Sequence, residues 1–294
     1  MERLLQVYRI VVKAASAWFE DGAMSMAAAI AFYTTFSLAP IVILVTAFAG
    51  IIFGEQAAQG AIADQIEELV GPAEAQTVQT LVASARSPGA STLAGIFGIG
   101  VLIIGATTVF GELQAALNRI WRVEPPNEAL VTWLVKARLK GLALVGAIGF
   151  LLIVSLTIST ALGALTTLAK THLPEGAALF WMFDLVVSWF VFAVLFAAVF
   201  RVLPDTHIPW RDVALGAAIT SLLFLIGKFL ISLYLSTAGV ASTYGAAGSF
   251  VVILLWVYYS ASVFLFGAEV TRFYSEHLGS RTGRNTSARQ AAAE

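Results

Sequence analysis

Long apolar runs dominate the pattern of hydrophobic and polar positions along the chain. A bilayer core of about 30 Å needs roughly 20 helical residues to cross it, and six runs reach or approach that length. They cover residues 27–53, 93–110, 141–168, 179–200, 213–235 and 245–268. Because lipid leaves no partner for free backbone groups, each run should be an α-helix. The pattern therefore predicts an all-α, polytopic membrane bundle of six transmembrane helices.

The first 20 residues show a different, amphipathic pattern. Polar residues from Glu2 to Glu20 recur on one helical face, and apolar residues such as Val7 and Val11 recur on the opposite face. This predicts an N-terminal helix lying in the membrane interface. The alternative is a soluble helix that packs on a partner.

Two further stretches are expected to flank the membrane without crossing it. Residues 54–91 carry two short apolar stripes separated by Gly71-Pro72, which predicts an external helical hairpin. The acidic residues of this hairpin are interpreted as a solvated face, with a cation site as the alternative. Residues 113–121 keep a helical apolar pattern and are expected to bend along the lipid headgroups.

Composition and charge fit a membrane protein and orient it. The 294-residue chain is 59% hydrophobic and 12% charged, whereas a soluble domain carries about 25% charged residues. In the six-helix arrangement, 14 of the 17 Lys and Arg residues fall on one side. The positive-inside rule then places both termini in the cytoplasm. Residues 1–278 are expected to form a single membrane domain, and residues 279–294 a disordered cytoplasmic tail.

The residue types also exclude several functions. A formal net charge of −1 gives no basic field for nucleic acid, and the absence of cysteine excludes thiolate chemistry. The three histidines, His172, His207 and His277, lie on separate connections, and no metal-binding or paired-carboxylate motif occurs. No Walker A motif is present. We therefore expect no catalytic activity, no metal or other cofactor, and no nucleic acid partner.

Lys228 is the most unusual residue, because it lies within the apolar run 213–235. At 1.5 Å per residue it lies about 12 Å below the outer end of that run, where a charge costs roughly 2.5–3.5 kcal/mol. Asp184 lies about 8 Å below the same surface in the preceding span. The matching depths predict an ion pair or an outward-facing, water-filled cavity. The alternative is a lysine that snorkels to the surface.

Other polar or helix-breaking residues inside the runs are candidates for lining a cavity. Pro40 interrupts the first span, which either frees a carbonyl toward a cavity or only kinks the helix. Trp256, Tyr258 and Tyr259 lie in the middle of the last span, where a tyrosine hydroxyl needs a partner inside the protein. Pocket lining and ordinary core packing remain open for them.

Charged residues bracket the expected cytoplasmic end of the bundle. Glu112 and Glu269 each follow a glycine-containing apolar run, and Arg119 and Arg201 lie close to the same surface. The functional interpretation is a gate in which a glutamate pairs with Arg201 or Arg119. The alternative is an interfacial anchor or a hydrogen bond between helices.

Three stretches carry a resemblance to a known family. They are "AIAFYTTFSLAP" at 29–40, "ALNRIWRV" at 116–123 and "YGAAGSFVVILLWVYYSASVFLFGAE" at 244–269. With these stretches the chain resembles the YihY/BrkB family, formerly mislabelled ribonuclease BN. The resemblance implies a six-span bacterial inner-membrane protein, and links to serum resistance and to movement of envelope lipids.

The sequence and the resemblance together suggest a function. We expect a transporter-like inner-membrane protein that moves a lipid or another amphipathic envelope molecule. Membrane lipids, and envelope-assembly proteins, are the expected partners. The alternative is a non-transporting scaffold or regulator of envelope assembly, which needs no central cavity.

Overall fold

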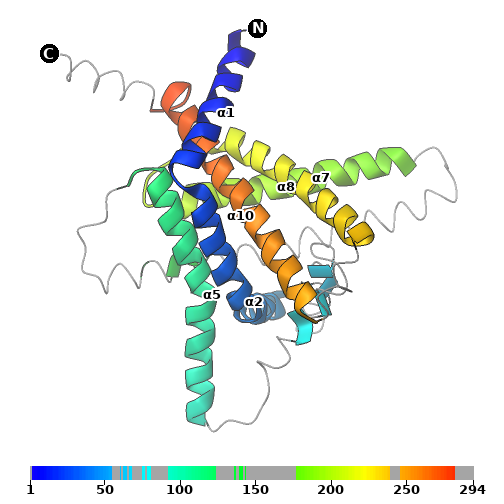
Figure 1. Cartoon of the computed structure of the whole chain (residues 1–294). Coiled ribbons are helices and arrows are strands. Elements are labelled where there is room, and N and C mark those ends of the chain that lie inside the picture. Colours follow the sequence, from blue (N-terminus) through cyan, green and yellow to red (C-terminus); the bar gives the residue numbers. More distant parts are fainter. Residues whose placement is uncertain are drawn as a thin grey trace.

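The structure is all-helical in the part of the chain that it describes. This computed structural model describes residues 2–54, 92–123, 177–238 and 246–281, with parts of 60–80 and 136–143. Within these ranges there is no strand. The long helices are α1 (Glu2–Glu20), α2 (Ala23–Phe53), α5 (Thr92–Ile120), α7 (Ala177–Val202), α8 (Trp210–Ala238) and α10 (Ala246–His277) (Figure 1). The predicted all-α class is thus confirmed for these residues.

Four helices in the described ranges are long and apolar enough to cross a membrane. The segments that qualify are Ala23–Thr46, Leu185–Val202, Trp210–Leu230 and Phe250–His277. They overlap four of the predicted spans, and α5 contains the predicted span 93–110. The predicted span 141–168 and most of the hairpin 54–91 lie outside the described residues. A bundle of six spans with an external hairpin therefore stays a prediction.

The helices extend beyond several predicted ends. α5 continues without interruption to Ile120, and Leu117 and Ile120 are fully buried. The expectation that 113–121 bends along the headgroups is therefore wrong: its apolar stripe packs in the protein core. Similarly, α10 continues to His277, well past the predicted end at 268.

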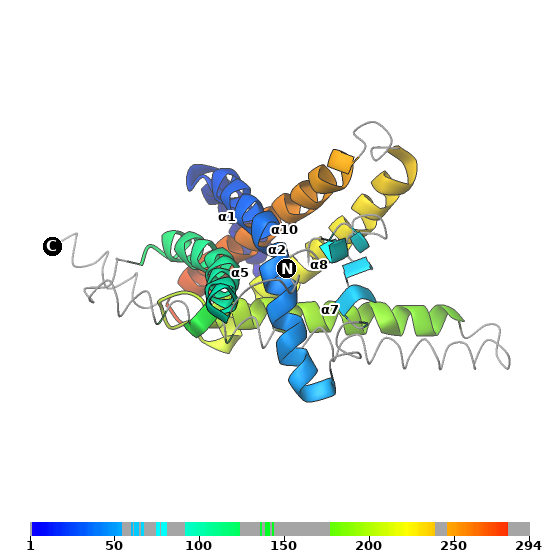
Figure 2. The same cartoon turned by 90° about the horizontal axis from the view of Figure 1, so that it is seen from below.

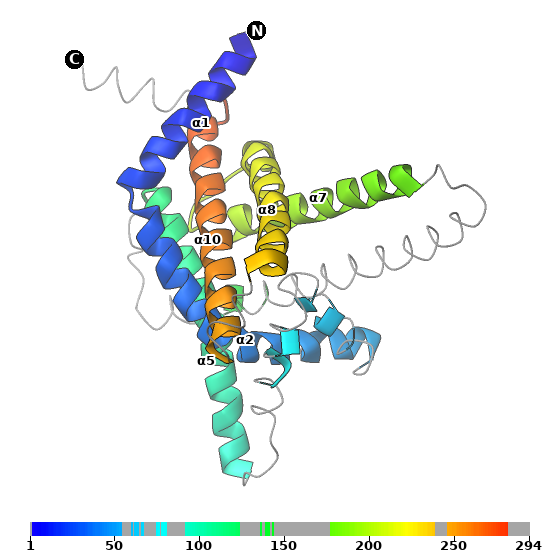
Figure 3. The same ribbon diagram turned by 45° about the vertical axis from the view of Figure 1, so that its right-hand side comes forward.

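Pro40 bends α2 without ending it. α2 runs unbroken from Ala23 to Phe53 with Pro40 inside it, and the helix changes direction partway along (Figure 3). A proline within a helix removes one backbone hydrogen bond and produces such kinks. Gly105 of α5 faces this proline, and a Cβ at Gly105 would lie 3.1 Å from Pro40 Cγ. The small residue thus lets α5 approach α2 beside the proline ring.

The N-terminal helix packs against its own chain. Ile10 and Ala14 of α1 are buried against Val270 of α10. The Trp18 indole N–H donates to the Ser262 carbonyl of α10 at 3.2 Å. One face of α1 is thus covered by α10, which sequence reasoning did not foresee. The opposite face exposes an apolar stripe of Leu5, Tyr8, Val12 and Phe19, and the interfacial position of this stripe stays a proposal.

The apolar core lies at one end of the bundle. Leu117, Ile120, Phe200 and Leu203 are almost completely buried there, at the C-terminal ends of α5 and α7. From this end α7 runs in a different direction from α8 and α10 (Figures 1 and 2). The part of α7 far from the core exposes large apolar side chains, namely Met182, Leu185, Val186 and Phe190.

α8 and α10 pack closely in antiparallel directions through a reciprocal contact. A Cβ on Gly216 of α8 would overlap the Thr271 hydroxyl of α10, and a Cβ on Gly267 of α10 would overlap the Thr220 hydroxyl of α8. Each threonine hydroxyl donates to the carbonyl of the glycine four residues earlier in its own helix, at 2.7 and 2.8 Å. We name these four residues the Gly–Thr clasp. Small residues of this kind allow membrane helices to approach closely.

The polar end of the bundle as a candidate functional site

Polar side chains, most of them buried or half-buried, gather at the end of the bundle that holds the core. They come from the α1–α2 junction, the end of α5, the α7–α8 connection, the start of α8 and the end of α10. We call this region the polar end; its residues are Asp21, Gln114, Asn118, Lys140, Asp205, Asp212, Glu269, Arg272, Ser275 and Ser280. The expected topology assigns all these segments to one side of the membrane, and the structure brings them together.

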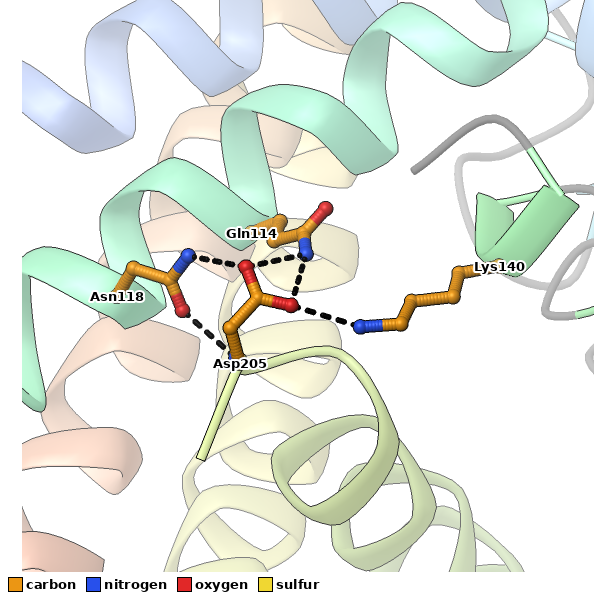
Figure 4. A network of polar contacts seen from close by, with 4 residues as sticks. All are labelled: Gln114, Asn118, Lys140 and Asp205. Carbon is orange, nitrogen blue, oxygen red and sulfur yellow. Dashed lines mark hydrogen bonds and ion pairs between the residues drawn. The ribbon is translucent and has the colours of Figure 1, made fainter. Parts of the chain in front are cut away.

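Asp205 is the centre of the first network (Figure 4). Gln114 Nε2 donates to both carboxylate oxygens at 2.9 Å, and Asn118 Nδ2 donates to Oδ2 at 2.9 Å. Lys140 Nζ lies 2.7 Å from Oδ1. The Asn118 side chain also accepts the Asp205 backbone N–H at 2.8 Å. Gln114 and Asn118 lie four residues apart, hence on one face of α5, and they tie the α7–α8 connection to that helix.

The hydrogen bonds of this network outweigh the effect of burial on Asp205. Burial alone would raise the pKa of the Asp205 carboxyl. Hydrogen bonds from Lys140, Asn118 and Gln114, with the charge of Lys140, lower that pKa below its ordinary value of 3.8. The carboxylate is therefore ionised under all physiological conditions and acts as a fixed anchor.

Glu269 and Arg272 form a buried ion pair within α10. Arg272 Nη2 lies 3.1 Å from Glu269 Oε2, and the two side chains are 5% and 0% exposed. Arg272 Nη1 donates to the Ile120 carbonyl at 2.8 Å and lies 3.4 Å from Asp21 Oδ2. One guanidinium thus joins α10, the end of α5 and the α1–α2 junction.

Asp212 holds the end of α10 against the start of α8. Its Oδ2 accepts the hydroxyls of Ser275 at 2.7 Å and Ser280 at 2.6 Å, and also the Ser280 backbone N–H at 3.1 Å. Asp212 lies in the first turn of α8, where a negative charge is favoured by the helix dipole. Arg281 continues the contact by donating to the Thr206 hydroxyl at 2.7 Å.

The predicted gate residues are only partly brought together. Glu269 lies in the polar end, but its partner is Arg272 and not Arg201 or Arg119. The Arg201 guanidinium instead lies 4.6 Å from the ring centre of Trp210. Arg119 is exposed and Glu112 is half-buried on α5.

The predicted pair of Lys228 and Asp184 stays a prediction. Lys228 is half-buried in the second half of α8. Asp184 lies in the first third of α7, and its side chain is outside the described part of the structure. α7 crosses α8, with the Trp189 indole N–H donating to the Ala218 carbonyl at 3.2 Å, and the two helices separate toward their far ends (Figure 1).

The aromatic cavity candidates pack between α8 and α10. Trp256 is 5% exposed, and its ring centre lies 5.1 Å from that of Phe224 on α8. The Tyr259 hydroxyl donates to the Leu223 carbonyl of α8 at 2.7 Å, and its ring fills the space beside Gly227. Tyr258 is partly buried against the main core. For Trp256 and Tyr259, contact between helices is thus the role that the geometry shows.

Sequence reasoning missed Asp21, Asp205, Asp212 and Arg272. A signal existed for Arg272, because a spacing of three residues places it on the same helical face as Glu269. In the described residues there is no cluster of three or more His, Asp or Glu side chains that could hold a metal ion. The arrangement suits locking helices together and holding or releasing a proton.

The comparisons with known proteins agree on one family. The chain matches the family model described as Virulence factor BrkB over residues 14–292. A UPF0761 membrane protein of Alcanivorax borkumensis is 27% identical over 266 residues, which are 88% of this chain and 59% of the relative. Another of Rhodospirillum centenum is 28% identical over 272 residues, or 92% of this chain and 58% of the relative.

A further UPF0761 membrane protein, of Yersinia pestis, is 30% identical over 192 residues, covering 63% of this chain and 61% of the relative. The chain thus spans less than two thirds of the length of these curated relatives. No solved structure matches the chain. The family match includes the three stretches that carried the resemblance, and the relatives are membrane proteins. The chain is therefore an integral membrane protein that belongs to the Virulence factor BrkB family.

Proposed function

We propose that the protein moves a lipid or another amphipathic envelope molecule across or within the bacterial inner membrane. The observation that carries this proposal is the asymmetry of the bundle. The polar end is closed by the networks of Asp205, Asp212 and Arg272, whereas α7 diverges from α8 and α10 beyond it (Figure 2). Beyond the contacts of Trp189 and Phe192 with α8, the first part of α7 exposes large apolar side chains, which suits contact with lipid chains.

The position of Lys228 supports an anionic or zwitterionic cargo. Lys228 lies 18 residues after Trp210, hence about 27 Å along α8 from the polar end. It is half-buried there, and its neighbour in sequence, Gly227, packs against Tyr259 of α10. A cation inside a membrane segment usually marks a path for a polar or charged group.

We place the polar end on the cytoplasmic side, with both termini in the cytoplasm. The support is the positive-inside rule, since the segments that meet there carry most of the Lys and Arg residues of the chain. We also infer that the protein is not an enzyme and needs no cofactor, because its sequence lacks a motif that joins an acid, a base or metal ligands. Membrane lipids and envelope-assembly proteins remain the proposed partners.

One observation favours the alternative, a non-transporting scaffold of envelope assembly. Trp256 and Tyr259 fill the contact between α8 and α10, and the Gly–Thr clasp leaves no space between the same helices. A bundle that is packed throughout would hold its helices for a partner and would move nothing.

Lipid movement in proteoliposomes separates the two functions. Full-length protein is reconstituted with a fluorescent anionic phospholipid, and a membrane-impermeant quencher reports the fraction of lipid that reaches the outer leaflet. Wild-type protein should raise this fraction above that of empty liposomes. Lys228→Met should reduce the rate, Lys228→Arg should retain it, and Lys136→Met, at an exposed lysine, should have no effect.

The results decide the proposal as follows. A rate equal to that of empty liposomes, for several headgroups and at inside-acid and inside-alkaline pH, would contradict transport and favour the scaffold. Wild-type movement that Lys228→Met leaves unchanged would retain transport and remove Lys228 from the path.

A further inference from the structure

Glu269 is a fully buried carboxyl group that accepts no well-aligned hydrogen bond from the described residues. Neither of its carboxylate oxygens has a hydrogen-bond partner among the described residues, although Oε2 lies 3.1 Å from Arg272 Nη2. Buried polar atoms are almost always hydrogen-bonded. An ionised carboxylate in this position therefore accepts too few hydrogen bonds for its charge.

Asp21 and Glu269 are neighbours, because both carboxyls contact the Arg272 guanidinium: Asp21 Oδ2 lies 3.4 Å from Nη1, and Glu269 Oε2 lies 3.1 Å from Nη2. Two carboxylates are both acceptors, so neither can satisfy the other while both are ionised. One added proton converts this contact into a hydrogen bond from one carboxyl to the other. Two acids held this close commonly share one proton, because like charges at contact distance oppose joint ionisation.

The charge balance around the two carboxyls favours binding of that proton. Arg272 is the cation in contact with both carboxyls, so the three groups together carry one negative charge when both acids are ionised. Arg122 acts on Glu269 from the end of α5, but its side chain is exposed. A proton on the pair makes the group neutral, which favours burial.

Among the described residues, the other helices packed against α10 bring no further cation to Glu269. α2 contains no charged residue. On α8, Asp212 is occupied by Ser275 and Ser280. On α1, Lys13 contacts His277, two turns of α10 beyond Glu269.

We propose that Glu269 and Asp21 form a proton-binding site, in which the two carboxyls share one proton while the polar end is closed. Loss of the proton to water leaves two facing carboxylates beside one guanidinium, and their repulsion releases the α1–α2 junction from α10. Asp21, whose side chain is 22% exposed, provides the route to water. This inference does not depend on the transport of any cargo.

Thermal unfolding of the purified full-length chain in detergent tests the shared proton. A free glutamate ionises at about pH 4.3, so the unfolded chain holds no such proton at neutral pH. The stabilisation is then complete at low pH and is lost as pH rises through the titration of the pair. The Tm of the wild type should therefore fall between about pH 5 and about pH 8.

Substitutions at Glu269 and Asp21 test whether this pair causes the fall of Tm with pH, which we call the slope. Glu269→Gln donates permanently to Asp21 and should remove the slope; Asp21→Asn, which leaves Glu269 ion-paired with Arg272, should remove it too. Glu20→Gln, at an exposed neighbour of Asp21, should keep it. Infrared difference spectra should show the C=O stretch of a protonated carboxyl at neutral pH in the wild type and not in Glu269→Gln. An absent band, with equal slopes in all variants, would overturn the shared proton and identify Glu269 as an ordinary ion-pair partner.

Spin labels test the release of α1. The chain has no cysteine, so Ser16→Cys and Glu276→Cys allow one pair of labels to be placed on α1 and α10. The distance between the labels should lengthen at high pH and stay constant in the Glu269→Gln background. A distance that does not change with pH in either background would overturn the release.

Discussion

Replacing Asp205 by alanine removes the acceptor on which Gln114, Asn118 and Lys140 converge. The substitution leaves the backbone N–H of residue 205 bonded to Asn118, so the α7–α8 connection keeps one of its attachments. What it removes is the carboxylate that accepts from three side chains at 2.7–2.9 Å. The expected result is loss of stability at the polar end.

The size of the effect follows from the exposure of each partner. The Gln114 residue is only 3% exposed, so its stranded amide donor should cost about 1–3 kcal/mol. Lys140 is 37% exposed and can return to water, so its ion pair contributes about 0–1 kcal/mol. With a smaller contribution from half-buried Asn118, the total is about 1–4 kcal/mol. Asp205→Asn should cost less, because the Gln114 amide can turn to present its oxygen.

Reversible unfolding in mixed micelles measures this difference. Glu276→Ala, which removes a half-buried carboxylate from the end of α10 and leaves the residues of these networks unchanged, is the matched control and should change stability little. The wild-type advantage over Asp205→Ala should also shrink as pH falls below about 4, because the low pKa of Asp205 stabilises the fold only above its titration. A loss of stability below about 0.5 kcal/mol at neutral pH would refute the argument, because leaving a buried amide donor without an acceptor costs about 1–3 kcal/mol.

Two further predictions concern packing and orientation. Gly216→Ala should destabilise the protein by about 1–3 kcal/mol in the same assay, because the new Cβ would meet Thr271 and lie 2.6 Å from the Gly267 carbonyl oxygen; Gly111→Ala, with open space around it, should not. In intact cells, Ser280→Cys should resist a membrane-impermeant maleimide while Ser87→Cys, in the predicted external hairpin, reacts; labelling at position 280 alone would reverse the proposed topology.

Hydropathy located α2, α7, α8 and α10 because about 20 consecutive apolar residues are a signal that needs no tertiary context. It placed the end of α10 too early because Glu269 and Arg272 count as two charges in a sequence. In the structure they neutralise each other inside the helix. Apolar periodicity likewise identified the face of α5 that contains Leu117 but could not distinguish lipid headgroups from protein core as its neighbour.

The candidate site was harder to predict, because its contacts join distant parts of the chain. Gln114 and Asp205 are 91 residues apart, and Arg272 and Asp21 are 251 residues apart. A single sequence shows that Gln114 and Asn118 share a helical face, but not which loop that face meets. Lys228 could be identified because a charged residue inside an apolar run is unusual. Asp205 could not, because it lies in a polar connection, where a carboxylate is common.

The Gly–Thr clasp has a mechanical consequence. Because Thr220 and Thr271 donate within their own helices, the clasp itself contains no hydrogen bond between α8 and α10 that must break when one helix rotates about this crossing. The crossing is therefore a pivot, and Lys228, about 18 Å beyond Gly216 along α8, lies on the long arm of the lever.

Two hydrogen bonds between α8 and α10 oppose this rotation. On the short arm, the Asp212 carboxylate accepts the Ser275 hydroxyl. On the long arm, the Tyr259 hydroxyl donates to the Leu223 carbonyl. If the Asp212–Ser275 hydrogen bond at the polar end breaks, a small rotation there becomes a larger displacement at the far end of α8. A change in the charge of buried acids can therefore move the membrane-facing part of the bundle while every helix stays folded.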